Sequence, residues 1–138
     1  MYLDIGTKLP VNGDQVFLVS RCFSSAEAPF VLLYDAVKAR RAKRNIRRMD
    51  PAEVITVLGE DDFVRIEAPH WGIVWLRASE IRDIRELPEE SLATSDIRFG
   101  AFVLFKHDPE PPDEHAGFLL YGIQAEHVSR LLNRSEAE

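Results

Sequence analysis

Cysteine is almost absent from this 138-residue sequence, in which Cys22 is the single example. One thiol can form no internal disulfide, so a small fold stapled by disulfides is excluded, and the lack of such a framework fits a reducing compartment. Cys22 lies in the apolar run VFLVSRCF, where we expect a buried and inert thiol rather than a nucleophile.

Long hydrophobic runs are missing as well. A helix that crosses a bilayer needs about 20 consecutive apolar residues, and no run in this sequence approaches that length. The first ten residues also lack the basic stretch and apolar core of a signal peptide. We therefore expect a cytoplasmic protein that makes no use of a membrane.

Signatures of catalysis are the third absence. The chain contains no G-x-S-x-G elbow, no glycine-rich phosphate loop and no C-x-x-C pair. We therefore expect neither an enzyme nor a bound cofactor. Four histidines and 23 acidic residues leave an active site assembled in three dimensions as an alternative.

The composition that remains is that of a folded domain. Hydrophobic residues make up 46% of the chain and charged residues 29%, which is ordinary for a globular protein. This length is typical of one domain with its own core. We expect a single α+β domain over residues 1–133, followed by a frayed C-terminal tail at 134–138.

Alternating and helical patterns give the expected elements. Pairs of β-prone runs around turns predict three antiparallel hairpins, formed by residues 16–19 with 30–34, 63–68 with 73–77, and 102–106 with 118–121. Apolar spacing of three to four predicts helices at 36–49, 81–87 and 124–132. The expected fold is an antiparallel sheet of about three hairpins with helices packed on one face.

The segment 51–58 allows two interpretations. Asp50 with Glu53 fits a capping box and Gly59 fits a C-terminal cap, which favours a short helix. The run VITV within it is largely β-branched, which favours a strand. We favour the helix.

The first and third expected hairpins resemble each other at a constant offset of 87 residues. Gly13 matches Gly100, Val16 matches Val103, and residues 32–34 match 119–121. An internal ββα duplication is one interpretation, and the general similarity of amphipathic hairpins is the other.

Positive charge is concentrated in one segment. Between residues 36 and 49 there are seven cations and no acid, namely Lys38, Arg40, Arg41, Lys43, Arg44, Arg47 and Arg48. The rest of the chain has ten basic and 23 acidic residues, a balance of −13. On the predicted helix these cations repel one another at i,i+4, so something should offset the repulsion.

Three kinds of negatively charged group could neutralise this basic segment. The first is the chain's own acids at 60–62, 89–90 and 108–114. The second is an acidic protein partner, and the third is the phosphate backbone of a nucleic acid. The −13 balance elsewhere disfavours nucleic acid. The exposure of residues 38–48 distinguishes internal neutralisation from an external partner: the chain's own carboxylates would cover these residues, whereas a partner needs them exposed.

Two further features are candidate sites. The loop HDPEPPDEH holds His107, Asp108 and His115, which are ligand types for zinc or manganese, but its spacing matches no metal motif and a solvated hairpin tip explains it equally. Trp71 lies at the expected turn of the middle hairpin, either folded onto the core or presented to a partner.

The sequence therefore predicts, first, a non-enzymatic protein-binding module such as a small inhibitor, an immunity-type protein or a regulatory adaptor. The second prediction is a nucleic-acid-binding regulator that uses the basic segment. The third is a metal-dependent enzyme at the 107–115 loop. Unpaired sheet edges also make a homodimer an expectation.

Overall fold

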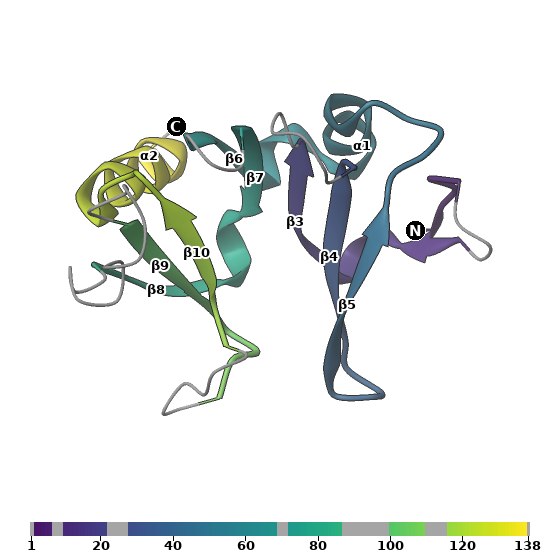
Figure 1. The fold of residues 1–138 in the computed structure, drawn as a ribbon, viewed down its shortest axis with the longest axis horizontal. Coiled ribbons are helices and arrows are strands. Elements are labelled where there is room, and N and C mark those ends of the chain that lie inside the picture. The colour runs from purple at the N-terminus through teal and green to yellow at the C-terminus, as the bar shows by residue number, and fades with distance from the viewer. Residues whose placement is uncertain are drawn as a thin grey trace.

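The computed structural model describes residues 2–6, 10–21, 28–68, 72–86, 100–109 and 116–137, with side chains in the last helix described as far as Asn133. Within this part of the chain, the strands form three antiparallel sheets (Figure 1). The five-stranded sheet has the order β5-β4-β3-β7-β6 and the three-stranded sheet has the order β10-β9-β8, while β1 pairs with β2.

The strands are β1 (Tyr2–Leu3), β2 (Val11–Asn12), β3 (Val16–Arg21), β4 (Phe30–Asp35), β5 (Arg40–Asn45), β6 (Phe63–Ala68), β7 (Gly72–Arg77), β8 (Ile81–Glu86), β9 (Gly100–Phe105) and β10 (Phe118–Tyr121). The helices are α1 (Pro51–Leu58) and α2 (Ala125–Ala137), with single 3-10 turns η1 (Gly13–Gln15), η2 (Glu60–Asp62) and η3 (Ala78–Glu80). The expected α+β class with antiparallel sheets is confirmed.

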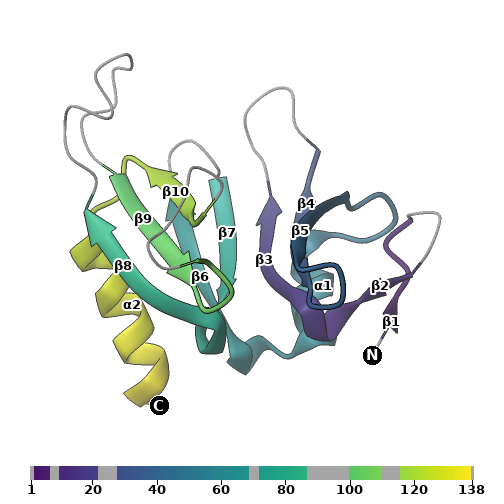
Figure 2. The same ribbon diagram turned by 90° about the horizontal axis from the view of Figure 1, so that it is seen from below.

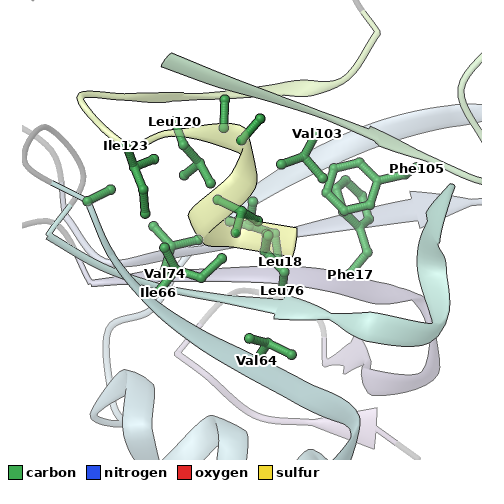
Figure 3. Packing of buried hydrophobic residues seen from close by; sticks show 14 of the residues in the cluster. Phe17, Leu18, Val64, Ile66, Val74, Leu76, Val103, Phe105, Leu120 and Ile123 are labelled. Atoms are coloured by element: carbon green, nitrogen blue, oxygen red, sulfur yellow. The ribbon is translucent and has the colours of Figure 1, made fainter. Parts of the chain in front are cut away.

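The core consists of two apolar clusters on opposite faces of the five-stranded sheet. One cluster lies between this sheet, the three-stranded sheet and α2, and includes Phe17, Phe105 and Val128 (Figure 3). The other is covered by α1 and the N-terminal strands, and includes Val31 and Val54. The helices therefore do not share one face as expected, because alternate residues of the central strands point to two different clusters.

The predicted basic helix at 36–49 is wrong. Residues 40–45 form strand β5 at the edge of the five-stranded sheet, paired with β4 from Asp35↔Arg40 to Phe30↔Asn45. A helix would hold like charges together at i,i+4, whereas a strand separates neighbours by about 3.3 Å and sends alternate side chains to opposite faces. The apolar stripe that suggested a helix is short, and strand β4 offers a complete backbone ladder.

The predicted helix at 81–87 is also wrong, since residues 81–86 form strand β8. The pairing of β8 with β9 shifts register between Ile81 and Asp83. This irregularity brings Ile81 and Ile84 to the same cluster although they are three residues apart, because a bulge adds one residue to the ordinary spacing of two. The bulge therefore produces a spacing of three between residues on one face, which is also the spacing expected of a helix.

The helix at 51–58 is present, as we favoured. Asp50 Oδ1 accepts a hydrogen bond from the Ala52 amide at 2.9 Å, and Pro51 occupies the first turn. The last turn ends at Gly59, whose φ of 111° suits glycine. Buried Val54 and Ile55 hold the helix against the sheet, so burial outweighs the strand preference of β-branched residues.

Two other expectations concern the C-terminal half. Helix α2 continues to Ala137, so most of the expected tail is helical.

The proposed duplication stays a prediction: both hairpin pairs are antiparallel, but Leu32 pairs with Leu18 whereas its counterpart Leu119 pairs with Phe102. Under the offset of 87, Leu119 would face Phe105.

The connection between β7 and β8 links the two larger sheets. Strand β7 leaves the five-stranded sheet through η3 and enters the three-stranded sheet as β8 (Figure 2). Residues from β3 and β9 consequently pack together, with the Phe17 and Phe105 ring centroids 4.6 Å apart. Both rings also contact His107.

Candidate functional site

Strands β4 and β5 and their connecting turn at 36–39 form what we call the cationic hairpin, residues 30–45. Its tip points away from α1 in Figure 1. Six of the seven cations of segment 38–48 are exposed, and Arg41 is half-buried. The exposed six are Lys38, Arg40, Lys43, Arg44, Arg47 and Arg48.

Within the described residues, Arg41 and Arg48 form ion pairs with carboxylates. Arg48 lies 3.3 Å from Asp4, but both side chains are more than three-fifths exposed, so the pair contributes little. Lys43 lies over the Phe30 ring at 4.5 Å. Within the described residues, no carboxylate lies within ion-pair distance of three of the cations, namely Lys38, Arg40 and Arg47. Among the described ion pairs of this segment, that of Arg41 with Asp108 has a buried carboxylate.

Arg41 joins the cationic hairpin to the β9–β10 hairpin. Its Nε donates to His107 Nε2 at 2.8 Å, and one terminal nitrogen donates to the Gly117 carbonyl at 2.6 Å. The other terminal nitrogen donates to Asp108 Oδ1 at 2.5 Å. These partners are 66 to 76 residues away in the sequence, so one side chain ties the edge strand β5 to the second sheet.

Asp108 is buried and fully engaged. Its side chain is 2% exposed, and its second oxygen accepts a hydrogen bond from the Phe105 amide at 2.7 Å. Arg82 donates to the Asp108 backbone carbonyl at 2.7 Å. A buried carboxylate needs such a set of charged and amide donors to offset the loss of water.

Aromatic rings enclose His107. The imidazole stacks on Tyr34 with centroids 4.4 Å apart and lies 4.7 Å from Phe17. The Arg41 guanidinium carbon lies 5.2 Å from the Phe17 ring and 5.5 Å from the Phe105 ring. Cation and imidazole are therefore held between the two sheets by flat apolar surfaces.

Burial and the neighbouring Arg41 cation lower the pKa of His107 to about 4, while the Asp108 carboxylate acts in the opposite direction. His107 is therefore neutral at physiological pH. Because Arg41 donates to Nε2, that nitrogen carries the lone pair and Nδ1 carries the proton.

This cluster of Arg41, His107 and Asp108 is suited to holding strands together rather than to chemistry. The lone pair of His107 Nε2 and both Asp108 oxygens already accept hydrogen bonds, and the Arg41 cation would repel a metal ion at the same ligands. In the part of the chain that the structure describes, no three His, Cys, Asp or Glu side chains are placed to hold a metal.

The role of Arg41 could not be found from the sequence. It is one of seven similar cations, and its partners lie in a loop that looked like a solvated tip. The adjacent His107 and Asp108 were noted as metal-ligand types, and the structure shows both of them bound to Arg41. Trp71, Cys22 and His115 fall outside the described residues, and so do acids 89–90.

No family model, curated protein or solved structure matches this chain. Across the residues that the structure covers, neither helix is long and apolar enough to span a membrane.

Proposed function

We propose that the protein is a non-enzymatic protein-binding module that uses the cationic hairpin and the following Arg47 and Arg48 to dock on an acidic surface of a partner. A small inhibitor, an immunity-type protein and a regulatory adaptor are the classes that this description fits. The observation that carries the proposal is the exposure of cations that the described acids do not neutralise.

The surroundings of these cations favour a protein over a nucleic acid. The remainder of the chain has a charge balance of −13, which repels a phosphate backbone. Binding of single strands also uses aromatic platforms for base stacking, and Tyr34 of this hairpin is stacked on His107. The tip instead carries the apolar side chain of Val37.

A nucleic-acid-binding regulator is the second candidate, supported by the shape of the hairpin. The major groove of DNA accommodates a two-stranded β-ribbon, and the basic segment is such a ribbon rather than the predicted helix. The exposed residues Lys38, Arg40 and Arg44 would then contact phosphates.

The third candidate, a metal-dependent enzyme at the 107–115 loop, is weakened because Arg41 occupies His107 and Asp108. Measuring metal content in the purified protein tests it. A homodimer is an additional proposal, supported by the outer strands β5 and β6 of the five-stranded sheet, and sedimentation velocity tests it.

The leading proposal is tested by titrating the purified protein with two fluorescent probes from about 50 to 200 mM salt, a range in which phosphate-dependent binding loses orders of magnitude in affinity. One probe is mixed-sequence DNA and RNA, and the other is a peptide of alternating glutamate and threonine. We expect binding of the peptide, weak binding of nucleic acid, and loss of peptide binding in the R40Q/R44Q/R47Q variant.

A matched variant, R65Q/R85Q/R130Q, removes the same charge from exposed arginines outside the hairpin and should bind the peptide normally. Tight, salt-sensitive binding of nucleic acid that R40Q/R44Q/R47Q abolishes would replace the proposal with the second candidate. Binding of neither probe at the lowest salt would contradict both.

A further inference from the structure

We infer that the tip of the cationic hairpin is a preformed apolar key: Val37 inserts into an apolar pocket, rimmed by carboxylates, on a folded protein partner. This inference rests on the proposed function and specifies the chemistry of its partner. The hairpin contributes one exposed apolar side chain, Val37, with the exposed cations Lys38 and Arg40 close to it in the turn.

Exposure singles out Val37 among the apolar residues. Val37 is 94% exposed, whereas the other large hydrophobic residues that the structure shows exposed, Tyr2 and Val57, are 72% and 43% exposed. Val37 lies at the turn and is followed directly by Lys38, with Arg40 at the start of β5. An isolated valine with neighbouring cations complements an apolar pocket with an acidic rim.

The turn is fixed by the protein's own groups before any partner binds. Asp35 Oδ1 accepts hydrogen bonds from the Val37 amide at 2.9 Å and the Lys38 amide at 3.1 Å. Ala39 has a φ of 51°, in the left-handed region that reverses the chain into β5. A loop held in its bound shape loses less conformational freedom on association.

The stem of the hairpin is fixed as well. The Arg41 side chain lies one residue beyond the turn's closing pair, Asp35↔Arg40. Through its bonds to His107, Asp108 and Gly117 it holds this end of β5 against the second sheet. Within the described residues, the most exposed of the large apolar residues therefore lies on a turn that the protein's own groups hold in place, which suits a protein partner with a defined pocket.

The experiment uses a displayed library of small three-helix domains, randomised without compositional bias over one face and selected on the intact protein. We expect the enriched clones to place Asp and Glu around an apolar pocket. Binding should fall about 10- to 100-fold with Val37→Ser, as burial of one valine implies, and should also fall with R40Q/R44Q. The control Val57→Ser should leave binding unchanged.

The outcomes separate the two proposals. Clones that lose affinity with R40Q/R44Q but not with Val37→Ser would overturn the apolar key while leaving the cationic docking surface in place. Clones indifferent to both variants, or no enriched clones, would contradict the key and the docking surface together. Binding to phosphatidylserine vesicles that Val37→Ser weakens, without enriched clones, would also overturn the key and identify a membrane surface instead.

Discussion

At the scale of single residues, the ion pair of Arg41 and Asp108 is the interaction whose loss we expect to cost most. Asp108→Asn leaves the Arg41 cation without its charged partner between the two sheets. Breaking a buried pair from one side costs about 3 to 5 kcal/mol, and because Arg41 is 22% exposed we expect a loss of about 2 to 4 kcal/mol in the free energy of unfolding. Urea denaturation measures it.

Asp83→Asn is the matched control for this prediction. Asp83 pairs with Arg85 at 2.8 Å, but both side chains are about half exposed, so its removal should cost less than about 1 kcal/mol. Equal losses in the two variants would show that the burial of Asp108 has no special role.

His107 gives the protein a predictable response to acid. A histidine in the unfolded chain titrates near pH 6.5, whereas the pKa of His107 in the folded protein is about 4 because of burial and the Arg41 cation. Between these values the unfolded chain takes up a proton that the folded protein does not. Stability from neutral His107 is fully present above about pH 6.5 and is lost as the pH falls towards 4.

We expect this group alone to lower the free energy of unfolding by about 2 kcal/mol between pH 6.5 and 4, after allowance for nearby solvent. Urea denaturation across this range, compared between the wild type and His107→Gln, measures the effect. The glutamine is neutral throughout and its oxygen can accept from Arg41, so its pH dependence should be shallower. His127→Gln, on an exposed position of α2, should keep the wild-type slope; a wild-type slope in His107→Gln would refute the assignment.

At the scale of elements, the turn of the cationic hairpin should respond to the backbone preference of residue 39. Ala39 has a positive φ, which costs an alanine about 1 kcal/mol or more and glycine almost nothing. Ala39→Gly should therefore raise the free energy of unfolding by about 0.5 kcal/mol, since glycine also gains freedom in the unfolded chain. Ala39→Val should lower it by about 1 to 2 kcal/mol. Thermal unfolding distinguishes the two, and identical midpoints would contradict the turn geometry.

The elements also show which parts of the fold the sequence could predict. Helix α1 was predictable because its caps are local: Asp50 and Gly59 act within a few residues of the helix. Strands β5 and β8 were not, because distant partners decide them. The β4 ladder makes 40–45 a strand, and a bulge against β9 places Ile81 and Ile84 on one face.

The candidate site was predictable in the same uneven way. The concentration of seven cations is visible in the sequence, so the segment proposed here as a docking surface could be named in advance. Which of them is buried could not, because Arg41 is distinguished by His107, Asp108 and Gly117, all contributed by another hairpin. The exposure of Val37 could not be predicted either, because Val37 lies in a turn and the sequence pattern placed it in a helix.

At the scale of the whole molecule, the cationic hairpin both contributes to the core and presents exposed cations. The clusters around β3, β7 and β9 supply the buried apolar surface. The cationic hairpin contributes its inner residues to these clusters, while Lys38, Arg40 and Arg44 on its outer side are exposed. Such cations add little to stability, so their presence is easier to explain through a partner than through the fold.

The most direct test of this account is the free energy of unfolding of R40Q/R44Q/R47Q, measured by urea titration beside Arg41→Gln. If these three cations face outward without a carboxylate partner in the protein, the triple variant should match the wild type within about 0.5 kcal/mol. Arg41→Gln should lose about 2 kcal/mol or more because Asp108 stays buried without its cation. A loss of 1.5 kcal/mol or more in the triple variant, on the order of that for a buried pair, would show that the protein's own acids neutralise the segment and would remove the basis for a partner-binding hairpin.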